Sequence, residues 1–184
     1  MEFLSTLWMP ILLSAVFVFI ASSIIHMFLG YHASDFDKLP EEDRTMDALR
    51  ALNIPPGHYI MPKAGSMKEF KTPAFQEKLD KGPAVFMHVR KHEKGMAKNL
   101  IQWFVYCIVI SFFSAYIGSH TVSQGSDYLV VFRVIGATAF MGYGLGMFQD
   151  AIWGSRSWNA TWKGAFDALI FALLTAGTFG WLWP

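Results

Sequence analysis

The sequence is poor in cysteine and in charge. Cys107 is the only cysteine, which excludes a disulfide framework and a cysteine-based zinc cluster. Charged residues make up 16% of the 184 residues, whereas soluble proteins average roughly 25%. The formal net charge is +1, so the bulk charge does not indicate nucleic acid as a partner. The high hydrophobic content of 53% excludes a disordered chain.

Familiar catalytic motifs are also absent from the sequence. It has no phosphate-binding loop, no dinucleotide fingerprint, no nucleophile elbow and no HExxH zinc motif. We therefore predict no cofactor, and we interpret the chain first as a protein without catalytic activity. Aromatic residues make up 16% of the chain, which is compatible with a lipid bound between helices.

Long apolar runs are what the sequence has in abundance. Four of them cover residues 7–30, 100–118, 128–148 and 165–183. A membrane-spanning helix needs about 20 mostly apolar residues, and each run reaches or nearly reaches that length. The sequence therefore predicts an all-α integral membrane protein with four transmembrane helices and a small α+β cytoplasmic insertion between the first and the second. Its parts are the first helix in 1–31, the insertion in 32–99 and helices two to four in 100–184.

The distribution of basic residues predicts the orientation. Twelve of the fifteen lysine and arginine residues lie in 32–99. Basic residues stay on the cytoplasmic side of a membrane, so we place this segment in the cytoplasm and both termini outside. This pattern is typical of a bacterial inner-membrane protein. The chain begins with Glu2 and no basic residue, so we expect an uncleaved first helix instead of a signal peptide.

The insertion has its own pattern of short elements. The sequence predicts helices over 41–52 and 72–81, and strands over 58–62 and 84–90. Thr72 is placed to cap the second of these helices, and Pro73 follows at its first position. So few elements are too small for a strong core of their own. We therefore expect the insertion to rest on the membrane helices, on an oligomer neighbour or on another protein.

Small residues recur at a spacing of four in the apolar runs. Gly142 and Gly146 form a GxxxG pair in the third run, and Ala176 and Gly180 form a small-xxx-small pair in the fourth. Such residues allow helix backbones to approach closely. The pattern predicts tight helix packing, either within one chain or between copies of it.

Ionisable residues inside membrane spans are costly, so each is a functional candidate. His26, Arg133, Asp150 and Asp167 lie in or at the ends of the runs. The predicted topology places Arg133 near the outer surface and the other three near the inner one. Lys163, one helical turn before Asp167, is the simplest expected partner for that carboxylate.

His26, His32 and Asp167 form the candidate metal set. Imidazole with carboxylate suits zinc, iron or manganese, and it equally suits a proton relay. On an ideal helix, residues six apart point about 120° away from each other, so the two histidines do not form the i, i+4 pair that commonly binds one metal. The alternative is a structural His26 whose ring is satisfied by Ser22 or Ser23, one turn earlier.

The layout of four helices with a long first cytoplasmic connection is similar in outline to the small membrane enzymes of glutathione and eicosanoid metabolism. Those enzymes carry a motif rich in arginine and asparagine on the second helix. Here the second run reads LIQWFVY over 100–106 and has no arginine. The similarity is one of topology, and topology does not assign a function.

Three functional hypotheses follow from the sequence. The first is a non-catalytic membrane subunit or oligomeric accessory protein, with lipid and a second membrane subunit or further copies of itself as partners and the insertion as docking surface. The second is a small homo-oligomeric transporter or channel that uses the intramembrane ionisable residues. The third is a membrane enzyme with a site at the inner leaflet, built from histidine and aspartate.

Overall fold

The computed structural model describes residues 2–91 and 95–184, which form two compact units. The first unit, here called the bundle, comprises Met1–Phe36 and Gly95–Pro184. The second unit, here called the insertion, is Asp37–Lys94. Each unit is described by itself.

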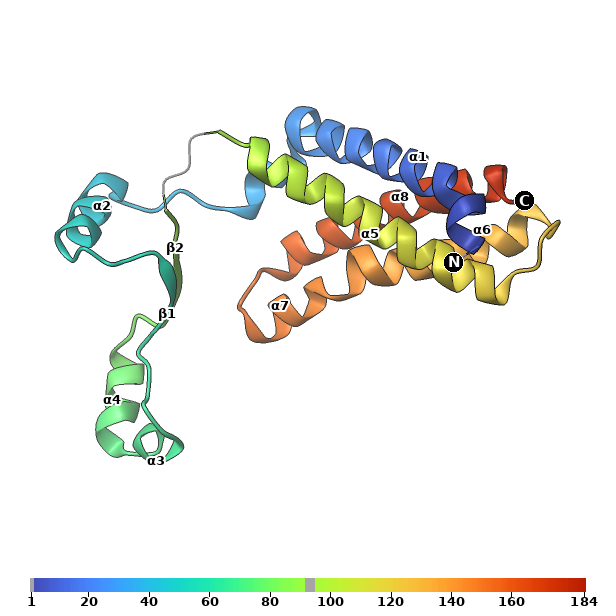
Figure 1. Cartoon of the computed structure of the whole chain (residues 1–184). Coiled ribbons are helices and arrows are strands. Elements are labelled where there is room, and N and C mark those ends of the chain that lie inside the picture. The colour runs from blue at the N-terminus through green and yellow to red at the C-terminus, as the bar shows by residue number, and fades with distance from the viewer. Residues whose placement is uncertain (1, 92–94) are drawn as a thin grey trace. The chain divides into compact units, whose positions relative to one another are not determined.

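Four long apolar helices build the bundle, which confirms the predicted all-α fold with four membrane-spanning helices (Figure 1). They are α1 (Glu2–Ile24), α5 (Ala97–Thr121), a third span in pieces, and α8 (Trp158–Leu182). The third span consists of α6 (Tyr128–Phe140), the π-helical turn η3 (Met141–Leu145) and α7 (Met147–Trp153). The apolar runs thus mark an integral membrane protein.

The helices extend beyond the apolar runs that predicted them. The fourth begins at Trp158, where the sequence indicated residue 165. The Ser157 hydroxyl caps it by accepting a hydrogen bond from the Ala160 amide at 3.2 Å. Apolarity measures the part of a helix that can lie in lipid, whereas the cap decides where the helix begins. The π turn in the third span has no counterpart in the apolar pattern.

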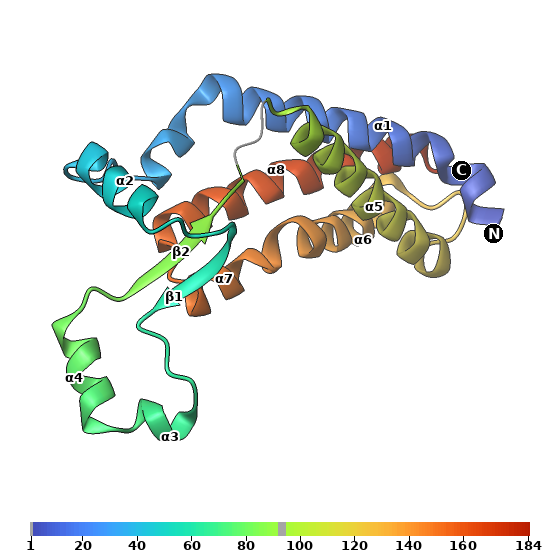
Figure 2. The same ribbon diagram turned by 60° about the vertical axis from the view of Figure 1, so that its left-hand side comes forward.

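Each helix of the bundle packs against two neighbours (Figure 2). Helix α8 packs against α1 and α6, and α5 packs against the same two helices. The interior is mainly apolar and also holds buried serine and threonine side chains, and its alanines are small enough to let the backbones come together. Its fully buried apolar side chains include Ala15, Val18, Cys107, Ala115, Val131, Ile135, Ala139, Ala176 and Phe179.

The described residues of the insertion form a two-stranded sheet and three short helices. Strands β1 (Gly57–Met61) and β2 (Val85–Val89) pair antiparallel, as the prediction of a small α+β insertion required. The helices are α2 (Glu42–Ala51), α3 (Met67–Phe70) and α4 (Pro73–Lys81). Thr72 caps α4 through the Phe75 amide at 3.3 Å. Among the described residues of the insertion, Phe75 alone is buried.

Candidate functional site

The candidate site forms where α1 ends and the chain turns back on itself. Helix α1 continues into the π-helical turn η1 (Ile25–Leu29), and the 3-10 helix η2 (Tyr31–Asp35) follows. Gly30 lies between them with φ of +64°, a left-handed conformation that glycine adopts at little cost. The Ala33 amide donates to the Gly30 carbonyl at 3.0 Å and closes the turn.

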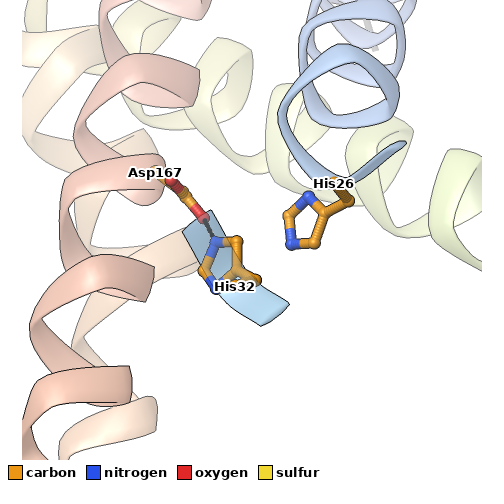
Figure 3. Close-up of side chains that lie close together, drawn as sticks. All are labelled: His26, His32 and Asp167. Carbon is orange, nitrogen blue, oxygen red and sulfur yellow. Dashed lines mark hydrogen bonds and ion pairs between the residues drawn. The ribbon is translucent and has the colours of Figure 1, made fainter. Parts of the chain in front are cut away.

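This turn brings His26 and His32 together, which corrects the expectation that they point about 120° apart. Their rings are stacked, with centroids 4.7 Å apart and planes inclined by 5° (Figure 3). The expectation was wrong because it assumed one continuous helix. The π turn and the reversal at Gly30 end the helical spacing between the two residues.

Helix α8 supplies Asp167, whose carboxylate accepts hydrogen bonds from this turn. His32 Nε2 lies 2.7 Å from Asp167 Oδ2, and His32 Nδ1 lies 2.6 Å from Asp35 Oδ2. The Tyr31 hydroxyl donates to the other oxygen of Asp167. Asp167 is buried, with 3% of its surface exposed. A buried carboxylate is stable only where it is paired and hydrogen-bonded, and this one is both.

Lys163 binds the same turn from one helical turn before Asp167 on α8. Its ammonium group donates to the Tyr31 carbonyl, to the Ser34 hydroxyl and to Asp35 Oδ1, each at 2.8 Å. Three donors therefore meet three acceptors. The expected pairing of Lys163 with Asp167 is wrong. The turn places Asp35 within hydrogen-bond distance of Lys163, and Asp167 pairs with His32 instead.

The electrostatics of the turn follow from these contacts. Burial lowers the pKa of His32, but its hydrogen bonds to Asp35 and Asp167 outweigh burial, so its pKa lies above the ordinary histidine value. Burial also acts to raise the pKa of Asp35, and the hydrogen bonds from Lys163 and His32 lower it below the usual range. Burial and the bond to Asp167 raise the pKa of Tyr31. His32 and Lys163 thus face the two carboxylates with hydrogen-bond donors.

His26 is the member of the group with an exposed ring. Its Nδ1 lies 2.9 Å from the Ser22 carbonyl, so the serine does satisfy one ring nitrogen, through its backbone. The Ser22 hydroxyl in turn accepts from the indole N–H of Trp103 at 2.7 Å. His26 and Trp103 line a cavity of about 220 Å³ together with Ser22, Ser23, Met27, Met96 and Leu100.

The other ionisable candidates lie elsewhere. Arg133 on α6 and Asp150 on α7 are both exposed. Within the described part of the chain, the Arg133 side chain has no ion-pair partner. The structure thus brings together His26, His32 and Asp167, and it does not bring Arg133 or Asp150 to them. These positions do not form a line of charged groups through the bundle.

The small residues divide between packed and open positions. A Cβ on Gly180 would lie 2.6 Å from the Tyr128 ring, and one on Gly142 would lie 2.5 Å from Ile110 Cδ1. Ala176 is fully buried and lies opposite Gly136, where an added Cβ would be 3.2 Å from the alanine Cβ. A Cβ on Gly146 would meet nothing within 4 Å. Three of the four predicted packing positions are therefore occupied within one chain.

Tyr31 and Ser34 belong to the site, and the sequence analysis missed both. Tyr31 follows a glycine at the end of an apolar run, where tyrosine is expected at a membrane interface for other reasons. A pattern search therefore gives no signal for its hydroxyl. Comparisons of this chain with family models, with curated proteins and with solved structures find no match.

Proposed function

We propose that this chain is a non-catalytic integral membrane subunit whose insertion binds a second protein. The supporting observation is the weak interior of the insertion, where Phe75 alone is buried among the described residues. A unit of this size that is stable by itself needs a contiguous apolar core. Contact with a partner would bury apolar surface that the insertion cannot bury by itself.

The exposed face of the two-stranded sheet is the docking surface we infer. Ile60 and Phe86 lie directly opposite each other in the register of β1 and β2. They are 42% and 50% exposed, while the neighbouring Tyr59 and Met87 on the other face are half-buried. A cross-strand pair of this kind offers an apolar anchor of the type that dominates protein interfaces. An isolated pair of strands is also marginal in water until something covers it.

The charge of the insertion favours a protein over a lipid surface as the occupant. Residues 37–94 contain eleven basic and nine acidic residues, a nearly balanced set. Lipid recognition uses dense clusters of lysine and arginine. Helix α2 instead carries Glu42 and Asp43 in its first turn and Asp47 in its middle. The excess of basic residues in the segment between the first two spans supports a cytoplasmic position, so we expect a partner on that side.

The hydrogen bonding at the end of α1 supports a structural role for this turn. Both nitrogens of His32, both oxygens of Asp167 and all three donors of Lys163 are engaged within the cluster. Groups committed in this way hold the turn against α8. They fix the 3-10 helix η2, after which the insertion begins at Asp37.

The test uses a photo-reactive amino acid at His88, which is exposed and lies on the same face as Phe86. Cross-linking in native membranes is expected to yield one second polypeptide, and native mass spectrometry is expected to find it at a fixed ratio. Ile60→Lys should lower the yield by about tenfold or more, because it places a charge at the anchor. Met67→Lys, on α3, is the control and should leave the yield unchanged.

Two results would contradict this proposal. A chain that cross-links only to itself and runs as a closed homo-oligomer would favour the transporter hypothesis. A chain that stays alone in its native lipids would remove the need for a docking surface.

A further inference from the structure

We propose that His26, His32 and Asp167 bind one divalent first-row transition metal ion, with zinc as the best fit. One ligand atom from each residue lies within 4.8 Å of the others. The three side chains come from the π turn, the 3-10 helix and α8, and they converge at the end of α1 (Figure 3). This inference does not depend on the proposed docking role of the insertion.

The hydrogen bonding of His26 leaves one ring nitrogen available to a metal. Its Nδ1 faces the Ser22 carbonyl at 2.9 Å, and a carbonyl can only accept a hydrogen bond. Nδ1 therefore carries the proton, and in the neutral ring Nε2 keeps the lone pair. Metal-binding histidines almost always donate their second nitrogen to a carbonyl or a carboxylate in this way.

His32 has the corresponding arrangement with a carboxylate. Its Nδ1 donates to Asp35 at 2.6 Å, and its Nε2 faces Asp167 at 2.7 Å. A carboxylate, a histidine and a metal in series are a recurring arrangement of zinc sites. A divalent ion entering between His32 and Asp167 takes the place of one proton on Nε2, so the two carboxylates keep a cation between them.

The His32–Asp167 pair requires only a small adjustment, whereas the His26 nitrogen, within 4.8 Å of the other two ligand atoms, has to move closer to them. Zinc bonds to nitrogen and oxygen are about 2.0–2.2 Å, so two ligands of a tetrahedral site are about 3.3 Å apart. Nε2 of His32 and Oδ2 of Asp167 are 2.7 Å apart in the hydrogen-bonded state, and they would separate by less than 1 Å. Asp167 is held in place by the Tyr31 hydroxyl on its other oxygen, which satisfies the outer shell.

The donor set and the access to it narrow the class of ion. Two imidazole nitrogens and one carboxylate suit zinc, iron(II), cobalt or manganese, while calcium and magnesium prefer oxygen ligands and copper(I) prefers sulfur. His26 is exposed and lines the cavity of about 220 Å³, which provides an entry path. Three protein ligands leave one position of a tetrahedral site to water or to another ligand.

The experiment uses the full chain in detergent, with its affinity tag removed and its metals stripped by a chelator. Cobalt(II) serves as the coloured probe, and zinc should displace it. We expect one equivalent of cobalt per chain with the visible absorption of a four-coordinate site. His26→Ala should weaken binding by at least 100-fold, since loss of an outer-shell partner alone typically costs 10- to 100-fold. Tyr31→Phe removes the hydroxyl that holds Asp167, so it should weaken cobalt binding by about 10- to 100-fold.

His120→Ala is the matched control. Its Nδ1 lies 2.7 Å from the Tyr116 carbonyl, so His120 repeats the local geometry of His26 on α5 without the other two ligands. His58→Ala is a second control, because the rings of His58 and His88 lie 4.5 Å apart on the sheet and offer a rival site. Both variants should bind cobalt as the parent protein does.

Three outcomes would overturn the metal site. They are the absence of stoichiometric cobalt or zinc in the parent protein, binding that survives His26→Ala, and binding that is lost in His58→Ala. Asp167 is buried, so Asp167→Asn is used only if it elutes and unfolds as the parent does. The exposed ring of His26 makes its variant informative whether or not the Asp167 variant folds.

Discussion

Replacing Lys163 by methionine removes the one cation that α8 contributes to the turn at the end of α1. Methionine keeps most of the length and apolar stem of lysine but donates no hydrogen bond. Three acceptors lose the lysine as a donor: the Tyr31 carbonyl, which keeps only a long contact of 3.4 Å from the Ser34 hydroxyl, the Ser34 hydroxyl itself and Asp35 Oδ1. Ser34 is exposed and can turn to water, so its loss costs little. The cost comes from the other two.

The magnitude follows from those two contacts. A hydrogen bond to a charged group contributes about 1.5–3 kcal/mol. The side chains of Lys163 and Asp35 are 20% and 9% exposed, so solvent screens their interaction only in part. Taking the lower value for each contact gives about 3 kcal/mol. Because about 1.4 kcal/mol is a factor of ten, the open population of the turn should rise by about 100-fold.

Hydrogen exchange of the η2 amides measures this opening, since the Ala33 amide is held by the Gly30 carbonyl. Lys81→Met on α4 is the control, because Lys81 makes an exposed pair with Glu77 at 2.8 Å. Such surface pairs contribute little, so exchange in α4 should change by about twofold at most. If Lys163→Met altered exchange of the turn by no more than that control, the cluster would not be what holds the turn to α8.

Two further predictions concern the helix contacts. Gly180→Ala should destabilise the protein by about 1–3 kcal/mol, because the added Cβ meets the Tyr128 ring. Gly146→Ala, where the added Cβ meets nothing, should be neutral or stabilising by about 0.4–1 kcal/mol. Thermal unfolding in one detergent measures both variants, and equal shifts would show that the packing contact has no effect. Ser111→Ala removes the acceptor of the 3.0 Å hydrogen bond that Ser14 on α1 donates to α5. We expect it to lower the stability by only about 0.6 kcal/mol, the average for such bonds in membranes. A loss of stability above about 2 kcal/mol in the same assay would contradict that value.

The sequence predicts the spans well because lipid imposes a simple rule. An apolar run of about 20 residues must be helical where no water can satisfy the backbone. The short elements of the insertion were predicted by local signals, such as the cap at Thr72 and the proline that follows it. Both kinds of signal lie within a few residues of the structure they determine.

The sequence predicted which residues belong to the candidate site, but it did not predict how they are arranged. His26 and Asp167 were identified by their cost inside a membrane, and His32 as a possible metal ligand just after the first run, yet the geometry of the three was not predicted. Gly30 decides that geometry, because its positive φ separates two helical segments of different type. Periodicity assigns faces within one helix, so it does not predict which residues meet across such a break. The partners of Lys163 were missed for the same reason.

Different interactions hold the two ends of α8 in the bundle, and the proposed metal would act at one of these ends. Apolar helices gain little by associating in lipid, so close packing and polar contacts decide how they pair. One end of α8 uses close packing at Gly180, and the other uses Lys163 and Asp167. A metal bound by Asp167 and the two histidines would add a bond at the polar end. Zinc should therefore slow exchange of the amides that Lys163→Met exposes, and His26→Ala should abolish that slowing while leaving the zinc-free rate nearly unchanged.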